Sequence, residues 1–209
     1  MTQEVLETGR PPRQPRPWVA YAVGGVVLVL ISMLSIAALA DLAARTVEMN
    51  NLLTRVEASE AAMKAAQDEV AAVLEPYSSG GMTDADRAKV RTELSDIAAR
   101  GRAAIAEAGA GVADVRVMTW HTGIRDGQRA YYDHNAAWVA YLTEAEQNPE
   151  TWFASQPDVN RTWDAAKGPL VSGVTVFDVG GALERIQRIY DEGGAGDNGG
   201  GDSGGGQPA

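Results

Sequence analysis

An uncharged apolar stretch, WVAYAVGGVVLVLISMLSIAALA from Trp18 to Ala40, constrains the fold of this 209-residue chain more than any other feature. A helix of roughly 20 apolar residues is long enough to cross a hydrocarbon core of about 30 Å. Trp18 and Tyr21 lie at one end of the stretch, and such rings favour the headgroup level of a bilayer. The stretch therefore predicts a single transmembrane helix over residues 18–40.

The charges on either side of this stretch predict its orientation. Arg10, Arg13 and Arg16 precede it, and only Arg45 follows closely. Basic residues that flank a span tend to stay in the cytoplasm. We therefore expect residues 1–17 to be a basic, proline-rich cytoplasmic tail and the chain after Ala40 to be extracytoplasmic.

A cleaved signal peptide is the competing interpretation of the same stretch. Ala38-Leu39-Ala40 has the small-x-small form of a cleavage site. The apolar region of a signal peptide usually runs about 7–15 residues, and this stretch is longer. The length favours an uncleaved anchor.

The rest of the chain is acidic and, like the whole sequence, contains no cysteine. Residues 41–209 carry 15 basic and 26 acidic side chains, a net charge of −11. Such a surface repels phosphate backbones, so we expect no nucleic-acid partner. The absence of cysteine excludes disulfides, thiolate metal sites and a cysteine nucleophile. The skew of three lysines against fifteen arginines suggests a GC-rich bacterial genome.

A seven-residue repeat of apolar side chains follows the membrane stretch. Neither proline nor glycine interrupts residues 41–75. This pattern predicts an amphipathic helix of bundle or coiled-coil type, continuous with the membrane helix and ended by Pro76 and SSGG. The repeat consists of Leu42, Met49, Val56, Met63, Val70 and Tyr77.

Two further long helices are predicted after this turn. Thr83 is a suitable N-cap, and Asp84 and Asp86 lie in the first turn, where the helix dipole favours acids. We expect Gly109–Gly111 to end or kink the second helix. The third then runs from about residue 112 to 147 and is weakened at Gly123 and Gly127. Three long helices joined by short turns predict an antiparallel bundle.

The last third of the chain predicts shorter helices. Asn148-Pro149 opens one around Trp152 and Phe153, and another covers residues 158–167 and ends at Gly168-Pro169. Residues 171–177 are expected to be extended or helical. A final helix from Asp178 to Asp191 turns Leu183, Ile186 and Tyr190 inward. The predicted fold is all-α, with a helical domain over residues 41–192 and a disordered, glycine-rich tail over residues 193–209.

The stretch AYYDHNAAWVAYL, residues 130–142, contains the candidate site. A helical wheel places apolar residues in one narrow sector, and Asn135 falls inside that sector. The buried amide either pins the register of packed helices, which we favour, or lines a small polar ligand pocket. The sector holds Trp120, Ile124, Tyr131, Trp138 and Leu142; the ligand hypothesis assigns Asn135, Tyr131, His134, Trp138 and Tyr141 to the pocket.

Neither a cofactor nor a catalytic site is expected. The side chains of His121 and His134 diverge by about 140° on one helix and cannot share a metal. In the tail, GDSGG (residues 201–205) and GAGDNG (residues 194–199) spell protease and dinucleotide motifs. They lack the β-barrel, strand and helix that those chemistries need. We expect no enzyme.

Two hypotheses for the function follow. The favoured one is a membrane-anchored extracytoplasmic helical module that interacts with a protein partner or with a second copy of itself, or that has a structural role in the cell envelope. The alternative is a ligand-sensing ectodomain that signals through a membrane partner, because the chain has no output domain of its own.

Overall fold

The computed structural model of the chain describes residues 17–175 and 180–193. These residues form five α-helices and two short 3-10 helices, and they contain no strand. The all-α prediction is confirmed for this part of the chain. The cytoplasmic-tail prediction, apart from its last residue, and the glycine-rich tail from Gly194 with its apparent motifs lie outside the described residues.

The chain divides into two compact units, Met1–Ala43 and Ala44–Ala209. Helix α1 (Pro17–Leu74) supplies residues to both, and the 3-10 helix η1 (Glu75–Tyr77) follows it, with Pro76 near its start. In the first unit, α1 is long and apolar enough to span a membrane, and none of its most apolar window is buried. In the second unit, α1 lines the core with Met49, Val56 and Met63 of the predicted repeat.

Helix α2 (Asp84–Ala113) begins as predicted and ends later than predicted. Thr83 and Asp86 form a capping box: the Asp86 amide donates to Thr83 Oγ1 at 3.2 Å, and the Thr83 amide donates to Asp86 Oδ2 at 3.0 Å. The expected break at Gly109–Gly111 is wrong. A Cβ placed on Gly109 would lie 3.1 Å from Asn135 Cβ. The glycine therefore allows α2 to approach α3 closely, and packing outweighs its low helix propensity.

Helix α3 (Thr122–Gln147) begins later than the expected residue 112, and residues 114–121 form the connection. The Gln128 side chain explains this boundary. Its Nε2 lies 2.8, 3.1 and 2.9 Å from the carbonyl oxygens of Val112, Ala113 and Val115. The two N–H groups of this amide are shared among these acceptors, which a helix end leaves open. Trp120 therefore lies outside the helix and is 61% exposed, so its predicted place in the core is wrong.

The C-terminal elements are η2 (Pro149–Phe153), α4 (Pro157–Gly173) and α5 (Ala182–Gly193). The expected end at Gly168-Pro169 is wrong, because α4 continues through Pro169. The carbonyl that this proline leaves without an intrahelical donor belongs to Ala165, an exposed residue that water reaches. In α5, Ile186 and Tyr190 are buried as predicted, but Leu183 is exposed. The predicted cap Asp178 lies outside the described residues.

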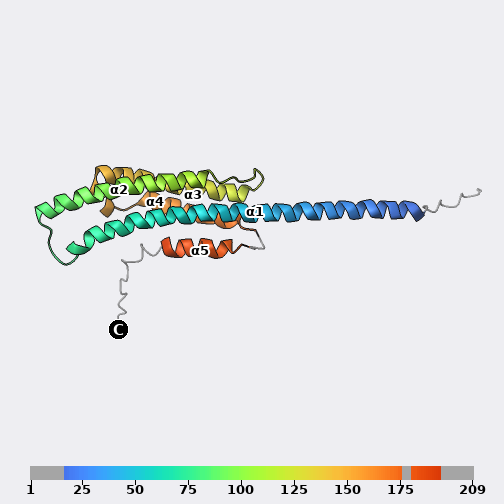
Figure 1. Cartoon of the computed structure of the whole chain (residues 1–209), viewed down its shortest axis with the longest axis horizontal. Coiled ribbons are helices and arrows are strands. Elements are labelled where there is room, and N and C mark those ends of the chain that lie inside the picture. Colours follow the sequence, from blue (N-terminus) through green and yellow to red (C-terminus); the bar gives the residue numbers. More distant parts are fainter. Residues whose placement is uncertain (1–16, 176–179, 194–209) are drawn as a thin grey trace, which may run out of the picture. The chain divides into compact units, whose positions relative to one another are not determined.

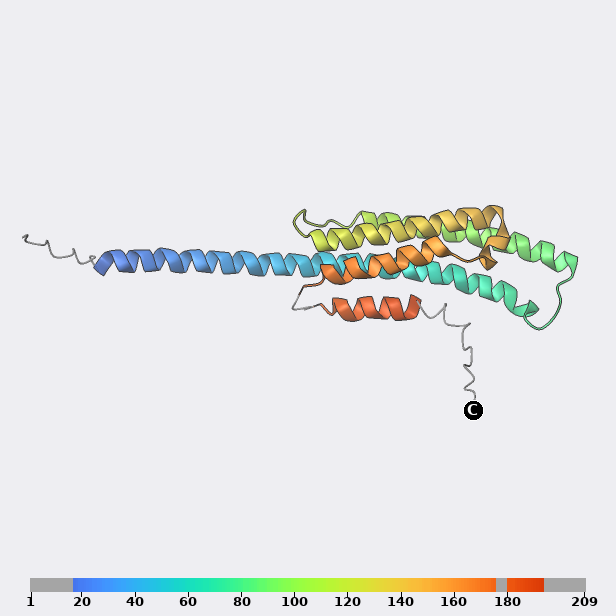
Figure 2. The same cartoon turned by 180° about the vertical axis from the view of Figure 1, so that it is seen from behind.

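Helix α3 packs against α2 and against α4 (Figures 1 and 2). Its contact with α4 depends on glycines. A Cβ on Gly123 would lie 2.9 Å from the carbonyl oxygen of Ser172, and one on Gly173 would lie 3.2 Å from Ile124 Cα. A Cβ on Gly127 would lie 3.2 Å from Leu170 Cα. The glycines that were expected to weaken α3 therefore allow two helix backbones to approach each other.

We predict that Gly123→Ala lowers the free energy of unfolding by about 1–3 kcal/mol, because the new methyl group meets backbone atoms that cannot move aside alone. Gly111→Ala in α2 is the matched control. There a Cβ would meet only the Arg55 side chain, at 3.6 Å, and the change should be neutral or stabilising by up to about 1 kcal/mol. Urea unfolding of the full chain in detergent, followed by circular dichroism, compares the two. Equal stability of both variants would contradict this account of the α3–α4 contact.

Candidate functional site

Two polar side chains on apolar helix faces meet in the core of the helical domain. Ser59 of α1 and Asn135 of α3 are both buried, and Asn135 is 2% exposed. Ser59 Oγ donates a hydrogen bond to Asn135 Oδ1. Asn135 Nδ2 donates to the Tyr131 carbonyl at 3.2 Å. The amide thus uses its carbonyl oxygen and one of its N–H groups within the protein.

This arrangement supports the structural interpretation of Asn135. A buried amide costs a few kcal/mol unless it is hydrogen-bonded, and here the partner stands on another helix. Sliding α1 along α3 would separate Ser59 from Asn135 and leave both side chains unsatisfied in the core. The pair therefore favours one register of the two helices, as a buried polar residue does in a coiled coil.

A second set of polar contacts begins at the next residue of α1. The Tyr131 hydroxyl donates to Glu60 Oε1 and lies 3.4 Å from the Val56 carbonyl. Glu60 Oε1 also lies 3.9 Å from His134 Nε2. The other ring nitrogen of His134 lies 3.1 Å from Thr162 Oγ1 on α4. These contacts join α1, α3 and α4 at one level of the domain.

Burial sets the protonation of this cluster. It raises the pKa of Glu60 to about 7, although the Tyr131 hydrogen bond opposes the rise. It lowers the pKa of His134 to about 4. The Tyr131 pKa is raised well above its ordinary value by burial and by the neighbouring Glu60. Between about pH 4.5 and 6.5 the carboxyl and the imidazole are therefore mostly neutral, and their 3.9 Å approach is not an ion pair.

Aromatic rings extend this cluster to α5. The His134 ring centroid lies 5.2 Å from that of Trp163 on α4, and Trp163 stacks on Tyr190 of α5 at 4.1 Å. The Tyr190 hydroxyl donates to the Trp163 carbonyl at 3.1 Å. His134 of α3 thus contacts α4, and α4 in turn contacts α5.

Trp138 and Tyr141 belong to a different cluster. Their rings meet edge to face, and Tyr141 meets Trp152 of η2 in the same way, both at 5.7 Å between centroids. The Trp152 indole donates to the Leu94 carbonyl of α2 at 3.2 Å. The structure therefore brings Asn135, Tyr131 and His134 together with α1, whereas Trp138 and Tyr141 pack toward α2 and η2.

Sequence reasoning missed the partners that α1 supplies. Ser59 carries a recognisable signal, because it stands seven residues after buried Leu52 and seven before buried Ala66. Two polar side chains on the apolar faces of two packed helices can satisfy each other's hydrogen bonds. Glu60 also lies at helical spacing from the core, four residues after buried Val56 and three before buried Met63.

His121 is a second residue that the sequence analysis misplaced. It was expected on the same helix as His134, but it precedes α3, is buried, and its Nδ1 lies 2.5 Å from Glu48 Oε2. Glu48 Oε1 also accepts the Met118 amide at 3.1 Å. This carboxylate therefore fixes the α2–α3 connection to α1.

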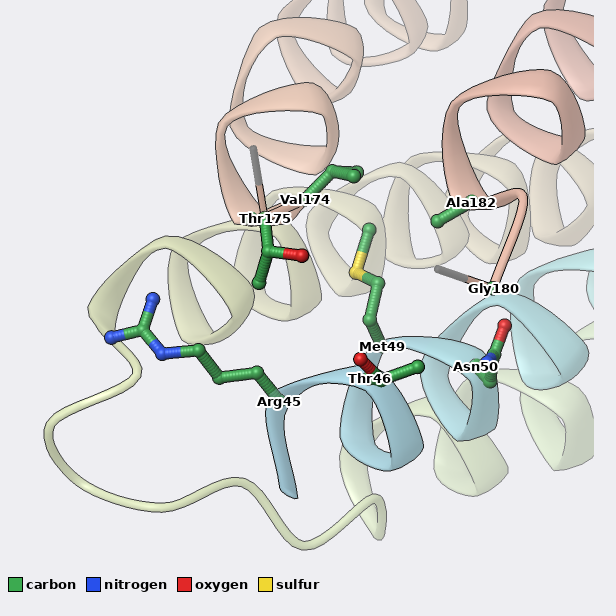
Figure 3. A pocket seen from close by; sticks show the side chains of 9 residues that line it. Arg45, Thr46, Met49, Asn50, Val174, Thr175, Gly180 and Ala182 are labelled. Atoms are coloured by element: carbon green, nitrogen blue, oxygen red, sulfur yellow. The ribbon is translucent and has the colours of Figure 1, made fainter. Parts of the chain in front are cut away.

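A surface hollow lies where α1, the end of α4 and the start of α5 meet (Figure 3). Its walls include Arg45 and Met49 of α1, Val174 and Thr175 after α4, and Ala182 of α5. It lies apart from the Ser59–Asn135 pair. Among the described residues, no group of three or more histidines and acids is arranged to hold a metal ion.

Comparisons with known proteins add no relative to this description: no protein-family model, curated protein or solved structure matches the chain.

We predict that Ser59→Ala lowers the free energy of unfolding by about 1–3 kcal/mol, because Asn135 Oδ1 is left buried without its donor. Thr143→Ala on the exposed side of α3 is the control and should change it by less than about 0.5 kcal/mol. Urea unfolding of the full chain in detergent measures both. If Ser59→Ala lowered the free energy of unfolding no more than Thr143→Ala does, the pair would not set the register of the two helices.

Glu60→Gln tests the electrostatics of the cluster. The folded chain binds the Glu60 proton more tightly than the unfolded chain, so the wild-type fold loses stability as the pH rises from about 4.5 to about 7. We predict equal stability of variant and wild type at pH 4.5. At pH 8 the variant should be more stable by up to about 3 kcal/mol. His134 has a lowered pKa, so by itself it makes the fold more stable as the pH rises from about 4 to 6.5. Both chains contain His134, so its contribution cancels in the stability difference between them.

Glu57→Gln is the matched control for that experiment. Arg185 Nη2 lies 2.7 Å from Glu57 Oε2, and its hydrogen bond lowers the pKa of Glu57. Glu57 therefore stabilises the fold above its ordinary pKa, and its removal should lower stability at pH 8. If the difference in free energy of unfolding between Glu60→Gln and wild type did not change with pH, Glu60 would not be desolvated in the folded chain.

Proposed function

We propose that the chain is a single-pass membrane protein whose helical domain, residues 41–192, lies outside the cytoplasm as an antiparallel bundle. In this proposal the domain acts as an interaction or structural module of the cell envelope. Its partner is another protein or a second copy of the chain. Residues 18–40 are the anchor, and residues 1–17 form a short cytoplasmic tail.

The exposed apolar stretch is the observation that carries this proposal. The most apolar 18-residue window of α1 has a mean hydropathy of 2.5, and none of that window is buried inside the protein. The helical domain has a core of its own, built from α1 residues after Ala44 and from the other helices. So large an apolar surface is unstable in water, and a bilayer is the solvent that suits it.

The arginine distribution supports the orientation. Three arginines stand before the span and one shortly after it, and the basic side of a span favours the cytoplasm. The acidic character of residues 41–209 is compatible with a soluble domain held beside a membrane.

The contacts of the aromatic stretch support a scaffold role over a catalytic one. Asn135, Tyr131 and His134 bind groups on α1 and α4. These side chains hold helices together in the structure. A rigid helical domain of this kind offers its outer faces to other proteins.

Ligand sensing is the alternative function. A ligand at Asn135 would have to replace the Ser59 hydrogen bond inside the core. A thermal melt of the full chain with metabolites and ions distinguishes the two functions. A ligand present at 100 times its Kd would add about 2.7 kcal/mol to the stability of the fold.

Crosslinking in native membranes tests the interaction proposal. The full chain and a chain that ends at Ala43 carry the same N-terminal tag, are crosslinked in cells, and are recovered after solubilisation. We expect the full chain to capture a defined protein, or a second copy of itself, that the shorter chain does not capture. Identical recoveries from the two chains would contradict an interaction role for the domain.

A further inference from the structure

Exposed apolar side chains of the helical domain gather at one end. This end, called the 114–121 end below, comprises residues 44–50 of α1, the α2–α3 connection at residues 114–121, residues 171–175 and residues 180–183. Figures 1 and 2 both show these segments at the same end of the helical domain. Most of the exposed large apolar residues of the domain belong to it: Val47, Met118, Trp120, Val171 and Leu183.

Hydrogen bonds hold the α2–α3 connection in place. Glu48 of α1 accepts the Met118 amide and lies 2.5 Å from His121 Nδ1, so it binds residues on both sides of Trp120. Arg125 Nη1 donates to the Thr119 carbonyl at 3.4 Å. A buried carboxylate thus fixes the backbone of the connection, while Trp120 remains 61% exposed and Met118 40% exposed.

The two ends of the domain differ in charge. The 114–121 end, counted together with the adjoining residues 112–113, 122–129 and 176–179, contains four arginines and four acids. The opposite end, counted with a similar margin over residues 75–91 and 144–161, contains seven acids and four basic residues. Arg87, Arg91 and Arg161 form ion pairs with Asp84, Glu150 and Asp158. The arginines at the 114–121 end are Arg45, Arg116, Arg125 and Arg129, and the acids there are Glu48, Asp114, Asp126 and Asp178, the last outside the described residues. The acids at the opposite end are Glu75, Asp84, Asp86, Glu144, Glu146, Glu150 and Asp158, and the basic residues there are Arg87, Lys89, Arg91 and Arg161.

This difference matters at a lipid surface. Anionic headgroups attract arginine and repel carboxylates. The 114–121 end carries no net charge and has arginine side chains for contact with phosphates, whereas the opposite end, with seven acids and four basic residues, has a net charge of −3 and is less favourable there. Electrostatics therefore favours one end of the domain for contact with a bilayer.

Chain length keeps the same end near the proposed anchor. Eight residues separate Ala40, the last residue of the apolar stretch, from Glu48, which binds the α2–α3 connection. Even fully extended, eight residues reach no more than about 28 Å. If residues 18–40 span a membrane, the 114–121 end is the part of the domain that this tether holds within reach of the surface.

We propose that the 114–121 end docks on the lipid surface of the membrane, with Trp120 and Met118 at the level of the headgroups and the arginines beside lipid phosphates. Tryptophan favours this level because its ring is apolar and its N–H is polar. The hollow drawn in Figure 3 lies at the same end, with Arg45 on its rim. This inference rests on the proposed membrane anchor, and it adds a second, peripheral contact that fixes how the domain stands on the bilayer.

Spin labelling of the full chain tests this proposal, because a chain without cysteine accepts a single label cleanly. The variants are Trp120→Cys and Met118→Cys at the 114–121 end, Phe153→Cys at the opposite end and Ile31→Cys in the apolar stretch. Phe153 is the matched control, because it is an aromatic residue that is 63% exposed. Each nitroxide-labelled chain is reconstituted in vesicles of phosphatidylcholine and phosphatidylglycerol. Collision rates with oxygen and with a water-soluble nickel chelate are then measured.

Labels at 120 and 118 should collide with the nickel chelate several-fold less often than the label at 153, and more often with oxygen. A label at 120 that collides with nickel as often as the label at 153 would overturn docking. So would a label at 120 that is shielded from both reagents, because protein and not lipid would then cover it. The label at Ile31 separates the two proposals. If it is lipid-exposed while the label at 120 is in water, only docking fails; if it is itself in water, the anchor and the docking fail together.

Discussion

The contact between α1 and α3 is the constraint on which the helical domain depends. Ser59 and Glu60, adjacent on α1, bind Asn135 and Tyr131 of α3 inside the core. Apolar contacts alone tolerate sliding, because many registers bury similar areas. Hydrogen bonds between buried polar groups do not, because a shifted register leaves donors and acceptors without partners. This pairing therefore sets the position of α3 on α1. Helices α2 and α4 pack on α3, and α5 packs on α4 and is bound to α1 through Arg185.

Small residues complete that arrangement. Gly109 brings α2 close to Asn135, and Gly123 and Gly173 let α3 and α4 approach each other. Bulky rings then fill the spaces on either side of α3, with Trp163 and Tyr190 on one side and Trp152 on the other. The aromatic stretch of α3 is accordingly divided between two clusters that join it to different helices.

Local pattern predicted part of this fold. The seven-residue repeat of α1, the Thr83 cap and the turn at Pro76 are consequences of periodicity and of backbone chemistry, which neighbouring residues determine. The inward positions of Tyr131, Trp138 and Asn135 came from the same periodicity.

The failures have a common physical cause. Gly109 and Pro169 break helices in isolation, but here packing outweighs their propensities. Gln128 ends α2 from a distance of more than a dozen residues, and Glu48 buries His121 from another helix. Such long-range partners are invisible in a local pattern. Of the candidate site, the sequence identified the α3 side chains and missed Ser59 and Glu60, the groups that they contact.

The polar side chains inside the domain hold its own helices together, and we propose that its functional contacts lie on its outside. In the proposed arrangement the exposed apolar stretch anchors the domain in a bilayer and the 114–121 end lies against the lipid surface.

Topology is the most direct test of this account. Ser78→Cys, in the exposed turn after α1, and Thr2→Cys, in the N-terminal tail, are each treated with a membrane-impermeant maleimide in intact cells and after permeabilisation. The account predicts that residue 78 is labelled in intact cells and that residue 2 is labelled only after permeabilisation, with both chains in the membrane fraction. Labelling in the reverse order, or recovery of the chain in the soluble fraction, would contradict it.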